Sequence, residues 1–235
     1  MLTTVINTES LSSLDFVQPG LLILRNVLPN IVSMIIRFPE FDFDTAGVHP
    51  ADARVQQLLC YGQEFPEFQY LRKLELINVT IGAPEHRCNW NSISSLAFTR
   101  PKHQLRYGRD RDFEFDIRPL AALRDILPRL AAGKLTSLRL GSTFRFTKVA
   151  LPKEPHFLRL AYLELDGFKL DTPVNENTED NIMGFIERHR TSLRNITLID
   201  CSFDGTLQRR IVEEGVNEWM KKKEIPSVVQ YRWSR

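Results

Sequence analysis

The segment Leu71-Arg72-Lys73-Leu74-Glu75-Leu76 contains the pattern that indicates the architecture of this 235-residue chain. Apolar side chains occupy its first, fourth and sixth positions. The last two are two residues apart, which is the period of a β-strand, so both point to the same face. The residue between them points to the opposite face, and the first apolar residue enters the core from the preceding turn. We therefore predict a short strand that is buried on one face.

The same six-residue unit recurs along the chain. Three further clear copies begin at Leu135, Leu160 and Leu193, and two weaker copies begin at Ile31 and Ile93. Stacking such units buries a continuous apolar ridge that no single unit could bury alone. The sequence therefore predicts an α/β fold, namely a solenoid of irregular leucine-rich repeats in which about six strands form a largely parallel sheet.

The spacing of the units leaves room for helices between the strands. Unit starts are separated by as few as 22 residues (Leu71 to Ile93) and as many as 42 residues (Ile93 to Leu135). Regular leucine-rich repeats run ~20–29 residues, so the longer intervals hold insertions or long helices. Apolar residues at helical spacing favour helices in segments 50–59, 116–127, 178–190 and 206–223.

Individual residues mark the expected ends of the last two helices. Thr178 is expected to cap one helix, and Thr206 is expected to begin the other. Pro226 is expected to stop the final helix. Residues 228–233 then form either a short final strand or a packed extension of the fold.

The composition is that of an ordinary globular chain. Hydrophobic residues make up 43% and charged residues 26%, and the formal net charge is +2. No apolar run approaches the ~18 residues that would cross a bilayer, and residues 1–10 lack the basic and apolar regions of a secretory signal. Cys60, Cys88 and Cys201 are odd in number and far apart, which fits free thiols in a reducing compartment. We expect one domain over residues 1–235, in the cytoplasm or nucleus, with no membrane partner.

Residues 157–203 carry a more specific pattern. The strand unit from Leu160 is followed by Phe185-Ile-Glu-Arg-His-Arg190, and then by Ser-Leu-Arg-Asn-Ile-Thr-Leu ending at Leu198. This order of a strand, a helix that ends in Arg-His, and the motif Ser-Leu-Arg-x-Ile-x-Leu resembles the irregular leucine-rich repeat region of fungal F-box-like proteins. The resemblance extends over roughly residues 65–225.

The resemblance implies the substrate-recognition part of a cullin-based ubiquitin ligase adaptor. In such adaptors an N-terminal F-box binds the ligase core, and the repeats bind a client protein. Residues 1–60 would then be an N-terminal cap or a degenerate F-box region. We interpret Leu28–Ile36 as the first repeat strand, because the downstream helices of an F-box, with their Leu and Trp positions, are not visible. The expected partners are a client protein and, if the F-box is degenerate rather than absent, a cullin-based ligase core.

The strand residues that point away from the core are the candidate partner-binding residues. In a repeat array these side chains vary freely while the buried ridge stays fixed. They would bind a protein partner through hydrogen bonds and ion pairs, with Tyr162 as an aromatic anchor. Alternating Lys and Glu neighbours could instead pair with each other. The candidates are Lys73, Glu75, Arg139, Tyr162, Glu164, Asp166, Asn195 and Thr197.

The sequence contains no motif that indicates a particular reaction. Phosphate-binding glycine loops, nucleophile elbows and zinc-protease signatures are all missing from it. His86, Cys88 and His103 are too few for a zinc site, which normally needs four ligands. His189 is expected to interact with backbone carbonyl groups at a helix end. We therefore expect a binding protein rather than an enzyme, with no cofactor and no metal.

A basic stretch supports the main alternative. Residues 99–148 hold 12 basic and 5 acidic side chains, and the stretch of interest runs from Arg100 to Lys134. Such an excess would suit a nucleic acid or another anionic surface, and steep loss of binding with salt would support it. Acidic residues from Asp110 to Asp116 interrupt the stretch, so we favour a solvated surface of mixed charge. An enzyme with an unfamiliar site is the third hypothesis.

Overall fold

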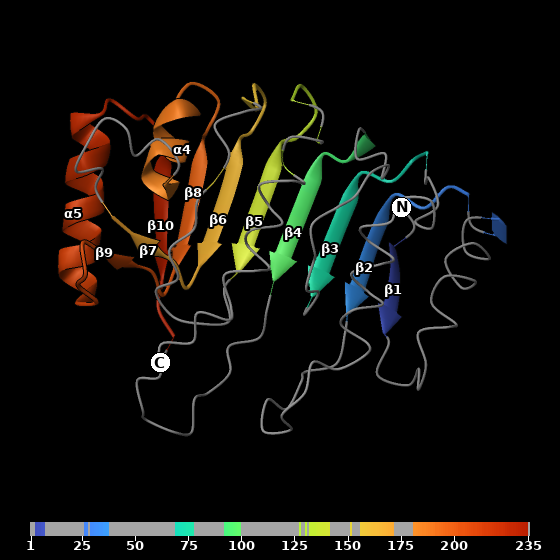
Figure 1. Ribbon diagram of the computed structural model, residues 1–235, viewed down its shortest axis with the longest axis horizontal. Helices are drawn as coiled ribbons and strands as arrows, with labels where there is room; N and C mark the ends of the chain where they lie inside the picture. Colours follow the sequence, from blue (N-terminus) through green and yellow to red (C-terminus); the bar gives the residue numbers. More distant parts are fainter. Residues whose placement is uncertain are drawn as a thin grey trace.

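The computed structural model describes the strand regions and most of the C-terminal third of the chain (Figure 1). These parts contain an eight-stranded sheet and two helices that pack on it. For residues 3–7, 36, 37, 76 and 98 only the backbone is described. The described ranges are 3–7, 26–27, 29–37, 69–77, 92–99, 127, 130, 132–141, 151, 156–171 and 181–234.

The central element is a parallel sheet whose eight strands lie side by side in the order in which they occur along the chain (Figure 1). Every neighbouring pair in this sheet is parallel. The predicted α/β fold with a largely parallel sheet is therefore confirmed, and the sheet has two strands more than the six units predict. The strands are β1 (Thr3–Asn7), β2 (Ser33–Arg37), β3 (Lys73–Ile77), β4 (Ser95–Thr99), β5 (Ser137–Gly141), β6 (Tyr162–Asp166), β8 (Asn195–Ile199) and β10 (Val228–Arg232).

The apolar residues of the units form continuous rows across one face of the sheet. Strand pairing aligns the fourth residue of each unit with the fourth residue of the next, and the sixth with the sixth. Leu140, Leu165 and Leu198, in the sixth position, belong to the same buried core. Full burial of one such side chain contributes about 1.5–3 kcal/mol. The fourth-position residues are Met34, Leu74, Leu96, Leu138, Leu163 and Ile196, all at most 2% exposed.

A repeated backbone contact joins successive units. The carbonyl oxygen of the second residue of a unit accepts hydrogen bonds from the second and third N–H groups of the next unit. At Val32 these bonds come from Arg72 and Lys73, at 2.9 and 3.0 Å. The same double contact recurs at the carbonyl groups of Arg72, Ser94, Thr136 and Ala161. Six successive units are therefore linked in the same way, although the segments between them differ in length.

Two helices and a small second sheet cover the apolar rows near β10 (Figure 1). Helix α4 spans Ile182–Arg188 and helix α5 spans Arg209–Lys222. The short strands β7 (Lys169–Leu170) and β9 (Ser202–Phe203) pair in parallel to form the second sheet. The residues that the helices bury in the shared core are Ile182, Met183, Phe185, Ile186, Val212, Val216, Trp219 and Met220.

Helix α4 begins later than the sequence predicts. Its N-cap is Asn181 and not Thr178, because the Asn181 Oδ1 atom accepts a hydrogen bond from the Gly184 N–H group at 2.6 Å. The helices predicted over 50–59 and 116–127 lie outside the described residues, apart from the buried Leu127. Within the described ranges, no helix combines the length and the apolar character needed to cross a membrane.

The start of helix α5 also differs from the prediction. Its N-cap is Gln208 rather than Thr206. Thr206 instead forms an antiparallel backbone bridge with Phe203, and its Oγ1 atom accepts a hydrogen bond from the Gln208 N–H group at 3.3 Å. Of the two alternatives for residues 228–233, the strand is right, since Val228–Arg232 forms β10.

At the other end of the sheet, the prediction for the segment around residue 33 is partly right. This segment forms strand β2, as expected for a repeat strand. It is the second strand and not the first, because β1 pairs with it in parallel. Strand β1 is hard to recognise in the sequence because Thr4 is aligned with Met34, where the other units carry an apolar residue.

Candidate functional site

All eight predicted partner-binding residues lie on the face of the sheet opposite the apolar rows. They occupy the third, fifth and seventh positions of their units, and side chains along a strand alternate between the two faces. We call this surface, made of the third-, fifth- and seventh-position residues of strands β2 to β10, the outer face. The register places Lys73, Tyr162 and Asn195 in its first row, Glu75, Arg139, Glu164 and Thr197 in its second, and Asp166 in its third.

Arg139 connects two carboxylates at the centre of the outer face. Its Nε atom lies 2.5 Å from Glu164 Oε1 on the adjacent strand, and its Nη1 atom lies 3.9 Å from Glu75 Oε1, two strands away. Ala97 lies between Glu75 and Arg139 in the row, and its small side chain leaves room for the arginine to cross β4. Ion pairing on the outer face therefore joins these three residues across strands. Because their side chains are 23–46% exposed, the pairs stabilise the fold by less than about 1 kcal/mol.

Two exposed apolar side chains flank Asn195 on the outer face. Tyr162 is 54% exposed and Val228 is 59% exposed. Both are aligned with Asn195 in the strand register. An exposed aromatic ring beside an amide and an aliphatic side chain offers both apolar contact and hydrogen bonding to a partner.

Strand β10 adds outer-face residues that the sequence analysis missed. Val228, Gln230 and Arg232 are exposed and extend the three rows. The unit pattern is broken there, because Pro226 stands where the other units have a leading apolar residue. The available signal is the spacing of Val229 and Tyr231, two residues apart, which pack on the core.

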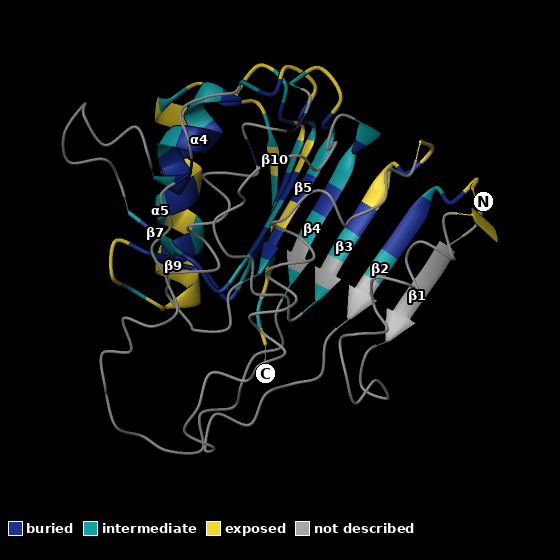
Figure 2. Ribbon diagram, turned by 45° about the vertical axis from the view of Figure 1, so that its right-hand side comes forward, coloured by how far each residue is buried: buried dark blue, intermediate teal, exposed yellow. Residues whose placement is uncertain are grey.

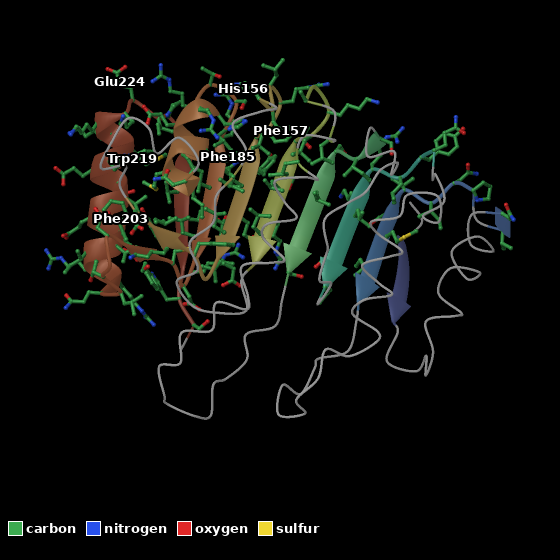
Figure 3. All side chains as sticks on the ribbon, viewed as in Figure 1. His156, Phe157, Phe185, Phe203, Trp219 and Glu224 are labelled. Carbon is green, nitrogen blue, oxygen red and sulfur yellow. The ribbon has the colours of Figure 1, made fainter. Side chains whose placement is uncertain are left out.

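His189 is buried at the end of α4 and joins this helix to the turn before β6. Figure 3 labels its two backbone partners, Phe185 on α4 and Phe157 in that turn. Its Nδ1 atom donates to the carbonyl oxygen of Phe185 at 2.8 Å, and its Nε2 atom accepts from the Phe157 N–H group at 3.0 Å. Its ring stacks on that of His156, with the centroids 4.6 Å apart. Burial lowers the pKa of His189 from 6.5 to about 4, so the ring is neutral. The predicted contact with a backbone carbonyl is confirmed, and both ring nitrogens are engaged within the fold.

Cys201 is a buried free thiol two residues after the end of β8. Its Sγ atom lies 3.5 Å from the carbonyl oxygen of Leu165. Burial raises the pKa of the thiol to about 12, which leaves almost no reactive thiolate at neutral pH. Cys201 is therefore a core residue rather than a nucleophile, whereas Cys60 and Cys88 lie outside the described residues.

The remaining candidates from the sequence fall mostly outside the described residues. His86, Cys88 and His103 belong to this group. Of the basic side chains in the stretch from Arg100 to Lys134, the structure describes only Lys134. Among the residues that are described, no three metal-ligating side chains are grouped so that they could hold a metal ion.

Comparison with known proteins adds no relative. The sequence matches no protein-family model, and neither a curated protein nor a solved structure is significantly similar to it. The geometry of the outer face and the residue patterns of the units are therefore the features that bear on function.

Proposed function

We propose that the protein is a binding module for other proteins, built as an array of irregular leucine-rich repeats, and that the outer face is its contact surface. The observation that carries this proposal is the alignment of exposed Tyr162, paired Arg139 and exposed Val228 on one face of an in-register sheet. Tyrosine and arginine are the residue types that dominate binding energy in protein interfaces.

The repeated backbone contact supports the repeat array. Units as far apart in the chain as those at Ile31 and Leu193 contribute to the same ladder, in the same register. Their buried positions are constrained by packing against the neighbouring units. The outer positions carry no such constraint, so they can hold whatever side chains a partner requires.

The resemblance to F-box-like proteins supports a narrower form of the proposal. In this form the array is the client-recognition part of a cullin-based ligase adaptor. Ser33–Arg37 is a strand of the sheet, so a docking element for the ligase core would have to come from other parts of residues 1–60. Recovery of a cullin ligase core together with a client distinguishes the adaptor from a stand-alone binding module.

Affinity purification from a cell lysate tests the proposal with the wild-type protein and three variants. Tyr162→Ala removes the aromatic anchor, and Thr197→Arg places a bulky side chain in the second row of the outer face. Ile211→Ala is the control, because Ile211 is a 46% exposed apolar residue on α5. We expect the wild type and the control to recover the same discrete proteins, and both outer-face variants to recover about tenfold less of them.

Thermal unfolding of all four proteins verifies that the variants are folded. Equal recovery of every captured protein by the outer-face variants and the wild type contradicts the proposal. Recovery that depends on Tyr162 and Thr197 without a cullin core supports the stand-alone module. Recovery of that core as well supports the adaptor.

A further inference from the structure

The turns that lead into the strands lie together along one edge of the sheet. All neighbouring strands are parallel and in register, so Lys73, Ser95, Ser137, Tyr162 and Asn195 begin their strands side by side. Exposed residues are concentrated in the turns just before these starts (Figure 2). We call this surface, formed by residues 69–73, 132–134, 156–162 and 190–195, the leading edge.

Positive charge gathers on the leading edge. Six exposed basic residues lie there, and no ion pair joins any of them to a carboxylate among the residues that the structure describes. The carboxylates described in the neighbouring turns are Glu187, which is bonded to Lys223 at 2.9 Å, and Glu224. The six are Arg72, Lys73, Lys134, Arg159, Arg190 and Arg194.

The opposite edge of the sheet carries charges of both signs, since Arg232 ends strand β10 there and aspartates lie beside the ends of the preceding strands. Asp166 ends strand β6, and Asp200 directly follows strand β8. Asp204 follows β9 at the same end of the C-terminal units. The positive charge is therefore a property of the leading edge and not of the described part as a whole. A ligand of negative charge would be attracted to that edge specifically.

Exposed apolar side chains are concentrated along the same edge. Among the residues that the structure describes, seven large hydrophobic side chains are exposed, and four of them lie in these turns or at the first residue of a strand. Leu158 is 68% exposed, beside Arg159, and Tyr70 is 45% exposed, two residues before Arg72. The other two are Tyr162 and Val228. Basic side chains and exposed apolar side chains are therefore interspersed along this edge of the sheet.

We propose that the leading edge binds an acidic, partly apolar segment of a partner protein. This inference rests on the proposed function, because it gives the same binding module a second contact surface beside the outer face. Arg72 and Arg194 lie four strand steps apart, or about 19 Å. An extended peptide covers this distance in about six residues. Its carboxylates would meet the guanidinium groups as two-pronged hydrogen-bonded pairs, and its apolar side chains would contact Leu158 and Tyr70.

The observations favour a protein segment over two other anionic ligands. Leu158 is the most exposed apolar side chain among those four, and an aliphatic side chain does not stack on nucleic-acid bases. The edge of a sheet follows the twist of its strands, which suits a flexible segment better than the flat surface of a bilayer. RNA and anionic lipid therefore become outcomes that the test must separate.

Selection from a random 12-residue peptide library on the immobilised full chain tests the inference. We expect selected peptides to combine carboxylates with aliphatic or aromatic residues. A labelled, selected peptide should bind the variant Arg159→Glu/Arg194→Glu at least about tenfold more weakly than the wild type. The control Arg209→Glu/Arg210→Glu changes the net charge equally at the start of α5, away from both proposed surfaces, and should bind within about twofold of the wild type. Binding to the wild type should also weaken between about 50 and 300 mM salt.

Several outcomes overturn the inference. Selected peptides without carboxylates do so, as does an acidic peptide that binds the Arg159→Glu/Arg194→Glu variant as tightly as the wild type. Two further probes are polyuridylate and phosphatidylcholine vesicles that contain phosphatidylserine. If one of them binds the wild type but not that variant, and no acidic peptide binds, the leading edge is assigned to RNA or lipid instead. Peptides blocked by Thr197→Arg but not by the edge variant leave the proposed function standing and refute this inference alone. If no peptide is selected, and if the outer-face variants recover the same lysate proteins as the wild type, both this inference and the proposed function are refuted.

Discussion

Arg139 and His189 each join segments that are far apart in the sequence, but they do so in different environments. Arg139 is partly exposed, and its two ion pairs order the side chains of the outer face more than they stabilise the fold. His189 is 1% exposed, and its ring nitrogens bond to a backbone carbonyl of its own helix, at Phe185, and to a backbone N–H group of the turn before β6, at Phe157. Loss of the His189 ring would leave the buried N–H group of Phe157 without its acceptor, which is costly, so His189 is expected to matter for stability.

The neutral state of His189 makes the stability of the fold depend on pH. The folded protein holds the pKa near 4, whereas the unfolded chain has the ordinary value of 6.5. The unfolded state therefore binds the proton more readily, and the contribution of His189 is complete above pH 6.5 and is lost as the pH falls toward 4. We expect the free energy of unfolding to fall by roughly 2 kcal/mol between about pH 7 and about pH 5 from this residue.

Urea unfolding of His189→Gln at the two pH values measures this contribution. A glutamine side chain can accept from Phe157 N–H and donate to Phe185 O without titrating. The variant should therefore lose less stability on acidification than the wild type. The control His156→Gln leaves both nitrogens of His189 bonded and removes only a smaller contribution to its lowered pKa, so it should retain most of the wild-type pH dependence. Identical pH dependence in the wild type and His189→Gln would contradict the assignment of a neutral, buried ring.

At the scale of elements, the packing of α5 on β9 depends on Gly215. A Cβ atom at this position would lie 2.6 Å from the Cε1 atom of Phe203, which is far inside ordinary contact distance. Glycine inside a helix normally costs about 1 kcal/mol relative to alanine. Its presence in the middle of α5 therefore reflects the close approach of the buried Phe203 ring.

The substitution Gly215→Ala should lower the free energy of unfolding by about 1–3 kcal/mol despite the better helix propensity of alanine. Gly133→Ala is the matched control, because a Cβ atom there would meet nothing within 4 Å. It should change stability by less than about 0.5 kcal/mol. Adding Phe203→Leu to Gly215→Ala should restore part of the loss. Chemical unfolding that finds Gly215→Ala more stable than the wild type would show that α5 does not pack closely on β9.

The strand elements were more predictable from the sequence than the helix ends. Buried residues at the fourth and sixth positions repeat with the strand period, so strands such as β5 and β6 follow from the leucine pattern. The start of α4 after Asn181 could not be predicted in this way, because several polar residues before Asn181 are equally suited to capping a helix. The sequence predicts that a helix begins at Thr206, but Thr206 forms a backbone bridge with Phe203 instead.

At the scale of the whole molecule, the sequence predicts the stacking of units but not all consequences of their register. That Lys73 and Thr197 share a face follows from counting positions within each unit. The ion pairs of Arg139 with both Glu75 and Glu164 require the strand order, since Ala97 must lie between two of them. The basic leading edge likewise emerges only when separate turns are brought side by side.

The strand order also explains how a chain with unequal intervals between its units presents continuous rows of side chains. Intervals between units vary, yet each unit returns the chain to the same register. Segments of different length can therefore be accommodated without disturbing the rows. The outer face and the leading edge both result from this register, so a test of the register tests both proposed surfaces.

Disulfide formation between introduced cysteines is the most direct measurement of the strand order. Ser95 and Ser137 are aligned on adjacent strands β4 and β5, where paired Cα atoms lie about 4.8 Å apart, within the range for a disulfide. Asn195 lies three strand steps from Ser95, or about 14 Å away, which is too far to bridge.

The measurement uses the full chain with Cys60→Ser, Cys88→Ser and Cys201→Ala, mild oxidation, and peptide mass spectrometry without reduction. We predict that Ser95→Cys/Ser137→Cys forms a disulfide, whereas Ser95→Cys/Asn195→Cys remains reduced. A disulfide in the second pair, or none in the first, would contradict the parallel, sequential array on which both proposed binding surfaces depend.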